Sequence, residues 1–268
     1  MSRTLVVTND FPPRHGGIET FVFALTEGLS ADEVVVYASS KHGDDAFDAG
    51  LAYPVVRDRA KVLLPTPRVA RRVREVFAAY GCDSVLYGAS APLGLLGPGL
   101  RSAGARRQVA LTHGHEVWWA RVPGSRELMR RIGDGTDVLT YVSQWCRDRI
   151  APTLSPEAAA RMRRLSPGVD TGRFFPGVGG PALRERLGIA ADRPVIGCVG
   201  RVVARKGQDT LVRAMPTVLA RVPEALLLIV GDGPYRSTVE ALARDLGVQH
   251  AVRFTGSVPS EDLPAYFD

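Results

Sequence analysis

Two glycine loops, one in each half of the chain, hold the residues best suited to chemistry. The first runs from Arg14 to Glu19 (RHGGIE) and the second from Gly200 to Gly207 (GRVVARKG). Each follows a short apolar run and precedes a segment with helical periodicity, and backbone amides at such a junction bind anions, phosphate above all. Neither loop has the GxGxxG pattern of dinucleotide-binding folds or the GxxxxGK[ST] pattern of P-loop proteins. A plain turn is the alternative interpretation of each glycine.

Within the second loop, Arg201 and Lys206 are two cations five positions apart that follow Gly200 at the end of a predicted strand. Ligands of open α/β sheets bind at the carboxyl ends of strands, so both cations would lie near a bound molecule. A guanidinium and an ammonium can together neutralise a diphosphate without a metal ion. The sequence therefore favours a phosphate site here, with a solvated loop as the alternative. Gly16 and Gly17 offer a second set of amides in the first half.

Composition excludes several classes of protein. The 268 residues are 45% hydrophobic and 23% charged, which is typical of one large or two smaller globular domains. The 34 basic and 28 acidic residues are interspersed and form no aromatic-interleaved basic ladder, so we expect no nucleic-acid partner. The apolar runs are too short to span a bilayer, and the N-terminal one ends at Thr8, which excludes a secretory signal. Cys82, Cys146 and Cys198 lie far apart, which argues against a zinc site or a disulfide framework and favours a cytoplasmic protein.

Short apolar strands alternate with helices, which predicts an α/β fold with parallel sheets covered on both faces. Strands are predicted at residues 4–8, 34–37, 84–87, 109–112, 139–142, 195–199, 226–230 and 252–255. Helices are predicted at residues 18–29, 209–221 and 235–246, and another begins at residue 261. Ser143 is a predicted N-cap for a helix through Ile150.

Proline and glycine are dense after Leu165, which predicts a linker between two domains. We place the first domain at residues 1–166, the linker at 167–185 and a second domain at 186–268. The second domain contains only about three βα units, whereas a doubly wound domain usually has five or six strands. We therefore expect the second domain to be incomplete.

Four motifs in the same order resemble those of the retaining GT-B glycosyltransferases of family 4. Residues 199–207 (VGRVVARKG) and 231–234 (GDGP) are similar to the nucleotide-sugar half of that family. Residues 16–19 (GGIE) match its G-G-[IV]-[EQ] loop, and residues 167–170 (PGVD) with Phe174 or Phe175 match its [NP]-G-V-D-x-x-x-F pattern. Residues 8–13 and 112–119 look most like the mannosyltransferases that add mannose from GDP-mannose to phosphatidylinositol mannosides. The resemblance implies two Rossmann-like domains that face a cleft.

The resemblance also implies roles for single residues. In the family the donor binds between the domains, and the residues that correspond to Arg201 and Lys206 hold its diphosphate. As the sugar leaves, fixed cations there would stabilise the transition state more than the ground state. His113 aligns with a histidine near the donor hexose, although a buried core histidine is the alternative. The other residues implied in donor binding are Gly16, Gly17, Gly200, Asp232 and Gly233, and the acceptor-side candidates are Asp10, Arg14 and Glu116.

No convincing DxD motif is present, so we expect no metal ion and no cofactor, with the nucleotide-sugar donor as substrate. The resemblance also implies retention on one face of the sugar, with the leaving phosphate taking the acceptor proton. The sequence shows no sign of the flanking carboxylate pair of retaining glycosidases. Glu116 could instead pair with an arginine, and Trp118 and Trp119 could line a sugar or lipid site or fill the core. Two alternatives stay open: a truncated, non-catalytic remnant that binds a nucleotide-sugar, and a family 4 transferase with another donor such as a UDP-sugar.

Four arginines, Arg68, Arg71, Arg72 and Arg74, accompany an apolar stripe at helical spacing. They form either a solvated helix face or a surface that docks on anionic lipid, which would place the protein at the inner face of the plasma membrane. The acceptor implied by the resemblance is an anionic glycolipid.

Members of the family carry a downstream E-x-F-G-x-x-x-x-E segment that grips the hexose and the ribose, and this sequence ends before such a segment. We expect a longer natural protein whose additional part covers a sheet edge and apolar surface. These 268 residues alone are expected to be poorly soluble or inactive.

Overall fold

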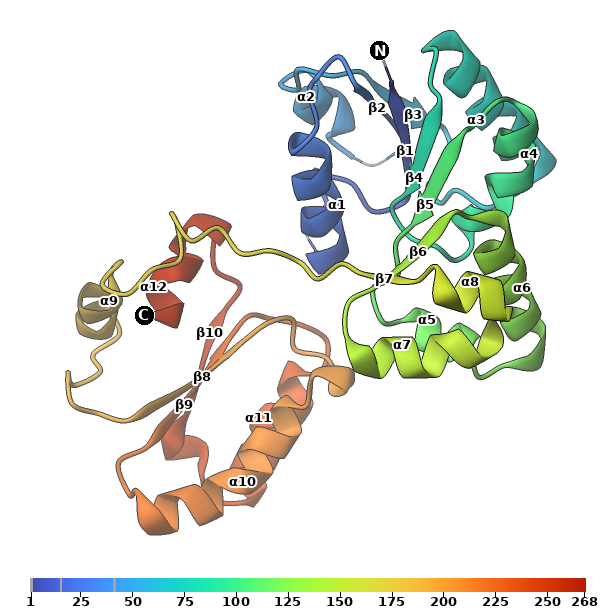
Figure 1. Ribbon diagram of the computed structural model, residues 1–268. Coiled ribbons are helices and arrows are strands. Elements are labelled where there is room, and N and C mark those ends of the chain that lie inside the picture. The colour runs from blue at the N-terminus through green and yellow to red at the C-terminus, as the bar shows by residue number, and fades with distance from the viewer. Residues whose placement is uncertain (1, 15, 41) are drawn as a thin grey trace. The chain divides into compact units, whose positions relative to one another are not determined.

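The computed structural model describes residues 2–14, 16–40 and 42–268 (Figure 1). Two compact units make up the chain, residues 1–168 and residues 169–268. Each unit has its own sheet and its own apolar core. No helix among the described residues is long and apolar enough to cross a membrane.

The first unit is built on a seven-stranded sheet with the order β3-β2-β1-β4-β5-β6-β7, and its paired strands all run parallel. The strands are β1 (Thr4–Thr8), β2 (Val34–Ser39), β3 (Val55–Asp58), β4 (Ser84–Tyr87), β5 (Arg107–Ala110), β6 (Val138–Tyr141) and β7 (Arg163–Arg164). The strand order reverses between β1 and β4. In open α/β sheets, ligands bind at the carboxyl ends of the strands that flank such a reversal.

Helices cover both faces of this sheet, with α1 and α2 on one side and α3, α4 and α6 on the other (Figure 1). The helices are α1 (Gly17–Glu27), α2 (Asp44–Asp48), α3 (Pro67–Ala79), α4 (Gly97–Ser102), α5 (Glu116–Trp119), α6 (Pro123–Gly135), α7 (Gln144–Ile150) and α8 (Pro156–Ala160). Because successive strand residues point to opposite faces, both faces need apolar residues. Accordingly, Leu5 and Val7 of β1 pack in one core cluster with Val69 and Val73 of α3, while Val6 packs in the other with Val22 of α1.

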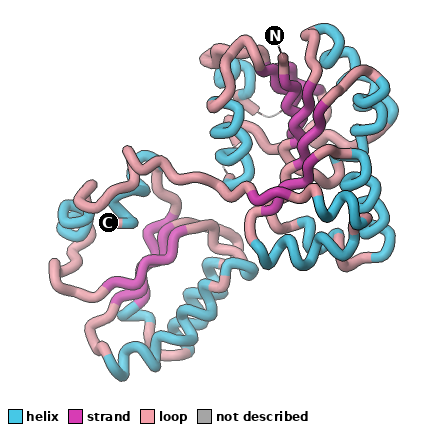
Figure 2. The backbone as a smooth tube through the Cα atoms, viewed as in Figure 1, coloured by secondary structure: helices cyan, strands magenta, loops and turns pink. Residues whose placement is uncertain are grey.

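The second unit contains a three-stranded parallel sheet with the order β10-β9-β8. Its elements are α9 (Gly180–Arg186), β8 (Val195–Val199), α10 (Gln208–Arg221), β9 (Leu226–Val230), α11 (Arg236–Asp245), β10 (Val252–Gly256) and α12 (Leu263–Phe267). The two long helices α10 and α11 lie side by side against this sheet (Figure 2). Leu227 and Ile229 of β9 pack with Val212 of α10 and Val239 of α11 in the core of this unit.

Several predicted bounds agree with the structure, including residues 4–8, 84–87, 195–199 and 226–230. Ser143 caps α7 as predicted, because its side chain accepts a hydrogen bond from the Cys146 amide. The strand predicted at residues 109–112 lies instead at Arg107–Ala110, where β5 pairs with β4. The predicted helix at residues 18–29 ends at Glu27, before Gly28. Strands β3 and β7 and the short helices α2, α4, α8 and α9 have too few periodic residues to be recognised in the sequence.

The predicted linker, residues 167–185, contains the boundary between the units at Gly168, and the rest of the segment folds with the second unit. The Asp170 carboxylate accepts a hydrogen bond from the Gly172 amide, which forms a turn, and the Phe174 ring packs edge-on against Phe267 of α12 at 5.8 Å. The Asp268 carboxylate accepts hydrogen bonds from the backbone amides of Gly177, Gly179 and Gly180. These contacts tie residues 174–180 to α12 and to Asp268, which follows it.

A buried carboxylate joins β2, β3 and α3 in the first unit. Asp58 is 4% exposed, and it accepts two hydrogen bonds of 2.8 Å from the Arg68 guanidinium, one from the Tyr37 hydroxyl and one from the Ala60 amide. The hydrogen bonds from Arg68 hold the pKa of Asp58 well below its usual range. Burial, together with the hydrogen bond to Asp58, raises the pKa of Tyr37.

Replacement of Asp58 by Asn should lower the free energy of unfolding of the first unit by roughly 3 kcal/mol at pH 7, because Arg68 loses its charged partner. Since the folded pKa of Asp58 is depressed, its stabilisation is complete above the unfolded value of about 4 and is lost as the pH falls below it. D58N should therefore show a weaker loss of stability between pH 4 and pH 2 than the wild type.

Urea unfolding followed by tryptophan fluorescence measures this, because Trp118, Trp119 and Trp145 all lie in the first unit. The exposed Asp32 provides a control, D32N. Equal effects of D58N and D32N would show that the Asp58 network does not stabilise the unit.

Candidate functional site

His113 lies at the carboxyl end of the sheet of the first unit, close to where the strand order reverses. Its ring packs edge-on against Phe21 of α1 at 5.8 Å, and its Nε2 is 2.5 Å from the carbonyl oxygen of Gly88, after β4. A carbonyl oxygen can only accept, so Nε2 carries a proton, and in the neutral ring Nδ1 keeps a free lone pair. The half-buried ring is thus oriented by the main chain and retains one hydrogen-bond acceptor.

Glu116 holds the loop that carries His113. Its side chain is fully buried, and its carboxylate accepts a hydrogen bond of 2.9 Å from the His113 amide and one of 3.3 Å from the Ser90 hydroxyl. The Nε2 atom of His115 lies 3.4 Å from the same carboxylate. In this conformation Glu116 joins the loops after β4 and β5 and presents no atom to an acceptor.

The first glycine loop leads into α1, which begins at Gly17. Gly16 and Gly17 are exposed, and the first amides of a helix lack partners within it. Glu19 is 5% exposed, and its carboxylate folds over Gly16, where a Cβ atom would lie 2.2 Å from Oε2. The Glu19 carboxylate is the end of a flexible side chain and could shift, and a Cβ at Gly17 would meet nothing within 4 Å, so packing by itself requires neither glycine.

The two predicted acceptor-side residues near this loop differ in their contacts. Arg14 is exposed, and its Nε atom lies 2.9 Å from Glu19 Oε1. The half-buried Asp10 is held through its backbone amide, which donates to the Thr8 hydroxyl at 2.9 Å. Its carboxylate has no hydrogen-bond or ion-pair partner within the described part of the chain. The Asp10 carboxylate is therefore available to a bound molecule, whereas Arg14 is already ion-paired.

The second glycine loop follows β8 and contains a short 3-10 turn, Ala204–Lys206, before Gly207 and α10. Gly207 has φ 72°, a left-handed conformation that favours glycine. The side chains of Arg201 and Lys206 are exposed, and over residues 2–14, 16–40 and 42–268 neither forms an ion pair or a side-chain hydrogen bond. Burial raises the pKa of the Cys198 thiol in β8, and the charge of Lys206 partly opposes this increase. The side chains of Arg201 and Lys206, the two cations of the predicted phosphate site, are thus without a hydrogen-bond or ion-pair partner among the described residues.

The loops after β8 and β9 approach each other at the backbone. Val202 donates from its amide to the Asp232 carbonyl at 2.9 Å, and Tyr235 donates to the Val202 carbonyl at 3.2 Å. A Cβ atom on Gly231 would lie 2.2 Å from the Gly200 carbonyl oxygen, and one on Gly233 would lie 2.2 Å from that of Val202. The glycines of GDGP are therefore required by this close approach, and they fix the backbone next to Gly200 and Arg201.

Asp232 is engaged within its own loop. One carboxylate oxygen accepts a hydrogen bond of 2.7 Å from the Gly233 amide, and the other lies 3.4 Å from Arg236, which also pairs with Glu240 at 2.7 Å. Its contacts orient the GDGP turn.

Sequence reasoning overlooked Gly88 and Ser90, the partners of His113 and Glu116, because they lie in a different loop with no motif of their own. It also overlooked Gln208, the first residue of α10, whose side chain is 1% exposed. A glutamine at the start of a helix is ordinary in a sequence, and only the burial of its side chain distinguishes it.

The two adjacent tryptophans differ in their exposure. Trp119 packs against the core, whereas Trp118 is 67% exposed, with the Arg121 guanidinium over its ring.

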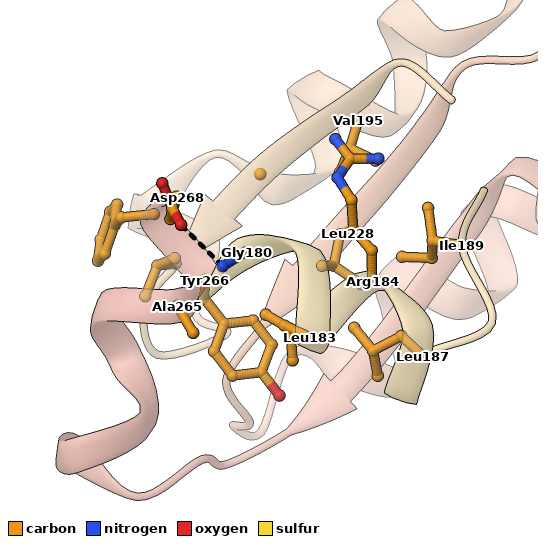
Figure 3. A pocket seen from close by; sticks show the side chains of 13 residues that line it. Gly180, Leu183, Arg184, Leu187, Ile189, Val195, Leu228, Ala265, Tyr266 and Asp268 are labelled. Carbon is orange, nitrogen blue, oxygen red and sulfur yellow. Dashed lines mark hydrogen bonds between the residues drawn. The ribbon is translucent and has the colours of Figure 1, made fainter. Parts of the chain in front are cut away.

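A hollow of about 280 Å³ lies in the second unit, between the sheet and helices α9 and α12 (Figure 3). Leu183, Val195 and Leu228 line it, and at its rim the Asp268 carboxylate accepts a hydrogen bond from the Gly180 amide. None of its lining residues belongs to the loops at 200–207 or 231–234. The hollow is therefore separate from the cations of the predicted phosphate site.

The arginines of α3 divide by their partners. Arg68 is committed to Asp58, while Arg71 and Arg72 both approach the exposed Glu75, at 3.7 Å and 3.1 Å. Arg74 donates to the Ala70 carbonyl. Arg68 thus serves the fold, and the exposed charge of this face comes from the other three.

No group of three or more His, Cys, Asp or Glu side chains within the described ranges is placed to hold a metal ion. The expectation that the reaction needs no metal stays a prediction.

Two family descriptions match the chain: residues 15–173 match Glycosyltransferase Family 4, and residues 181–268 match Glycosyl transferases group 1. The chain is 48% identical over 267 residues to the GDP-mannose-dependent alpha-(1-6)-phosphatidylinositol monomannoside mannosyltransferase of Mycolicibacterium smegmatis, covering 98% of this chain and 69% of that protein. It is 42% identical over 265 residues to the GDP-mannose-dependent monoacylated alpha-(1-6)-phosphatidylinositol monomannoside mannosyltransferase of Corynebacterium glutamicum, covering 97% and 68%.

Solved glycosyltransferases share the fold at low identity. Anabaena Alr3699/HepE in complex with UDP and glucose superposes with a TM-score of 0.76 at 16% identity, covering 98% of this chain and 71% of that one. WaaG, a glycosyltransferase involved in lipopolysaccharide biosynthesis, has a TM-score of 0.64 at 20% identity, with 98% and 71% covered. These similarities confirm the predicted α/β fold of the GT-B class.

Replacement of Gly233 by Ala should destabilise the second unit by roughly 3 kcal/mol, because the new methyl group would overlap the Val202 carbonyl. Hydrogen exchange of the β9 amides measures the stability of this unit, and tryptophan fluorescence gives that of the first unit as an internal reference. In β8, Gly197→Ala is the matched control, since its Cβ would meet only the Tyr266 carbonyl, at 4.0 Å. If G233A were as stable as G197A, the close approach of the two loops would not be a constraint.

Proposed function

Because the chain belongs to glycosyltransferase family 4, we propose that it transfers mannose from GDP-mannose, with retention, to a phosphatidylinositol mannoside. The observation that carries this proposal is the 48% identity with the M. smegmatis enzyme over 98% of the chain. The relatives from M. smegmatis and C. glutamicum share GDP-mannose as donor in their names, which supports a guanine nucleotide over a uridine nucleotide.

Arg201 and Lys206 are proposed to hold the diphosphate of the donor. Both are exposed and unpaired among the described residues, and they flank a loop that leads into the N-terminus of α10. In the transfer, the bond between the sugar C1 and the β-phosphate oxygen breaks, and C1 forms a bond with the acceptor hydroxyl oxygen. The acceptor proton passes to the leaving phosphate of GDP. Negative charge grows on that phosphate as the bond breaks, so two fixed cations stabilise the transition state more than the bound donor.

His113 is proposed to orient the hexose. Its Nε2–H group donates to the Gly88 carbonyl oxygen. In the neutral ring, Nδ1 is then the atom that can accept a hydrogen bond from a sugar hydroxyl. Glu116 acts through this loop: it fixes the His113 backbone from beneath and touches no substrate. We propose that no metal ion takes part, because the charge of the diphosphate is balanced by Arg201 and Lys206.

Alanine at Arg201 or at Lys206 should weaken GDP binding by about 10- to 100-fold, because each removes a charge-assisted contact. Transfer of radiolabelled mannose from GDP-mannose should fall further than donor affinity does, since these charges act most strongly in the transition state. Calorimetry with GDP, GDP-mannose and UDP measures the first effect, and a lipid-extraction assay measures the second.

Arg205 provides the matched control, because it is an exposed arginine in the same loop with no proposed contact. A loss in R205A as large as that in R201A would mean that general positive charge binds the nucleotide. Preference for UDP would contradict the proposed donor, and binding of GDP-mannose without transfer would favour the non-catalytic alternative.

We further propose that the protein works in the cytoplasm and contacts the inner membrane surface peripherally through α3 and the loop before it. Arg71, Arg72 and Arg74 are exposed on α3. In the preceding loop Val62 and Leu64 are 56% and 51% exposed, which adds apolar side chains to the basic face. Basic residues near an anionic surface contribute about 1 kcal/mol each, and apolar insertion adds to this. A glycolipid acceptor would be reached from such a surface.

The double variant R71Q/R72Q should bind vesicles of phosphatidylcholine with anionic phosphatidylinositol about tenfold more weakly than the wild type, with no change on pure phosphatidylcholine. Cosedimentation at low and physiological salt measures this, since the electrostatic part should weaken with salt. The matched control is R130Q/R131Q on α6, where two exposed arginines likewise share one glutamate, Glu127. Equal losses in both double variants would refute a specific role for α3.

A further inference from the structure

Gln208 lies buried directly beneath the loop that carries Arg201 and Lys206. It is the first residue of α10, and its side chain is 1% exposed. Its amide nitrogen Nε2 donates a hydrogen bond of 3.2 Å to the carbonyl oxygen of Arg201. The side chain thus joins the end of the loop at Gly207 to its beginning at Arg201.

The other end of this amide has no partner. Among the described residues, Gln208 Oε1 is the one buried side-chain oxygen or nitrogen without a hydrogen bond. The amide cannot satisfy it by turning over, because Oε1 would then face the Arg201 carbonyl, and two acceptors repel. A buried acceptor without a partner is unfavourable, and this cost offsets what the hydrogen bond to the Arg201 carbonyl contributes. Gln208 therefore contributes little or nothing to net stability.

A residue that is costly to bury and yields no stability is typical of a functional position. We propose that Gln208 is a positioning residue for the diphosphate site, which it serves by holding the backbone of Arg201 against the N-terminus of α10. The inference rests on the proposed donor site. It adds a residue that touches no substrate and acts through the placement of Arg201.

The geometry explains why Arg201 needs such support. Its backbone lies between Gly200 and Val202. The Gly200 amide donates to the Val230 carbonyl at the end of β9, and the Val202 amide donates to the Asp232 carbonyl in the loop after β9. Beyond Val202 the loop residues up to Lys206 are exposed or half-buried and carry no apolar anchor in the core. The Gln208 amide is the side-chain contact that links Arg201 to α10, and with it the two cations lie on one braced loop.

The test compares Gln208→Met with the wild type, because methionine keeps the unbranched shape and removes both polar atoms. Three quantities are measured: the affinity for GDP and for inorganic pyrophosphate by calorimetry, the midpoint of thermal unfolding, and hydrogen exchange of the Val202 and Lys206 amides without ligand. Gln249→Met is the control, since this glutamine is exposed in the same unit.

We expect Q208M to unfold at the wild-type temperature or above, while its affinity for both ligands falls about tenfold and the two loop amides exchange faster. Q249M should change none of the three. A lower unfolding temperature with unchanged exchange in the loop would give Gln208 a purely structural role and overturn the inference. Unchanged exchange with unchanged affinity would overturn it as well.

The exchange measurement separates this inference from the proposed function. If the wild type bound neither GDP nor pyrophosphate, the proposed donor site would fail. Faster exchange confined to the loop of ligand-free Q208M would still support the bracing of Arg201, and unchanged exchange would reject it.

Discussion

The close approach of two backbones, at the carboxyl ends of β8 and β9, is the constraint on which the structure of the second unit depends. The carbonyls of Gly200 and Val202 occupy the space that Cβ atoms at positions 231 and 233 would need. Two glycines remove that conflict, and amide-to-carbonyl hydrogen bonds then join the loops. Because the main chain is fixed in this way, the backbone of Arg201 has a defined position although its side chain is exposed. Arg201 thus combines a fixed backbone with a side chain that has no ion pair among the described residues, and the proposed diphosphate site requires a cation that is not already neutralised.

Buried polar side chains follow a different logic in the two units. In the first unit, Asp58 and Glu116 are buried carboxylates with several donors each, and they hold neighbouring segments together. Asp58 has a cationic partner in Arg68, so its network stabilises the fold. In the second unit Gln208 is buried with one hydrogen bond made and one missing. The Asp58 network strengthens the fold of the first unit. Gln208 instead lies beneath the loop that carries Arg201 and Lys206, and it adds little to the stability of the second unit.

Much of the fold could be predicted from the sequence, because short apolar runs between turn residues, such as residues 4–8 and 226–230, are typical of strands buried on both faces of a parallel sheet. The motifs also located the glycine loops and both cations. Prediction failed where the signal depends on contact across the fold. Nothing local to Gly88 or Ser90 indicates that they hold His113 and Glu116, and a two-residue strand such as Arg163–Arg164 has no periodicity to detect.

The arginines of α3 show that the number of basic residues in a sequence segment does not give the net charge of the surface that the segment forms. Four arginines at helical spacing look alike, yet Arg68 reaches a buried carboxylate that lies ten positions earlier, on β3. That pair removes one charge from the exposed face, and Glu75 partly balances two more. What remains is a weaker basic face beside the exposed Val62 and Leu64. The proposed attraction to an anionic membrane would therefore combine a modest net charge with apolar contact, and binding of that kind is reversible and sensitive to salt. An enzyme that must release one lipid product and reach the next acceptor gains from an attachment of that strength.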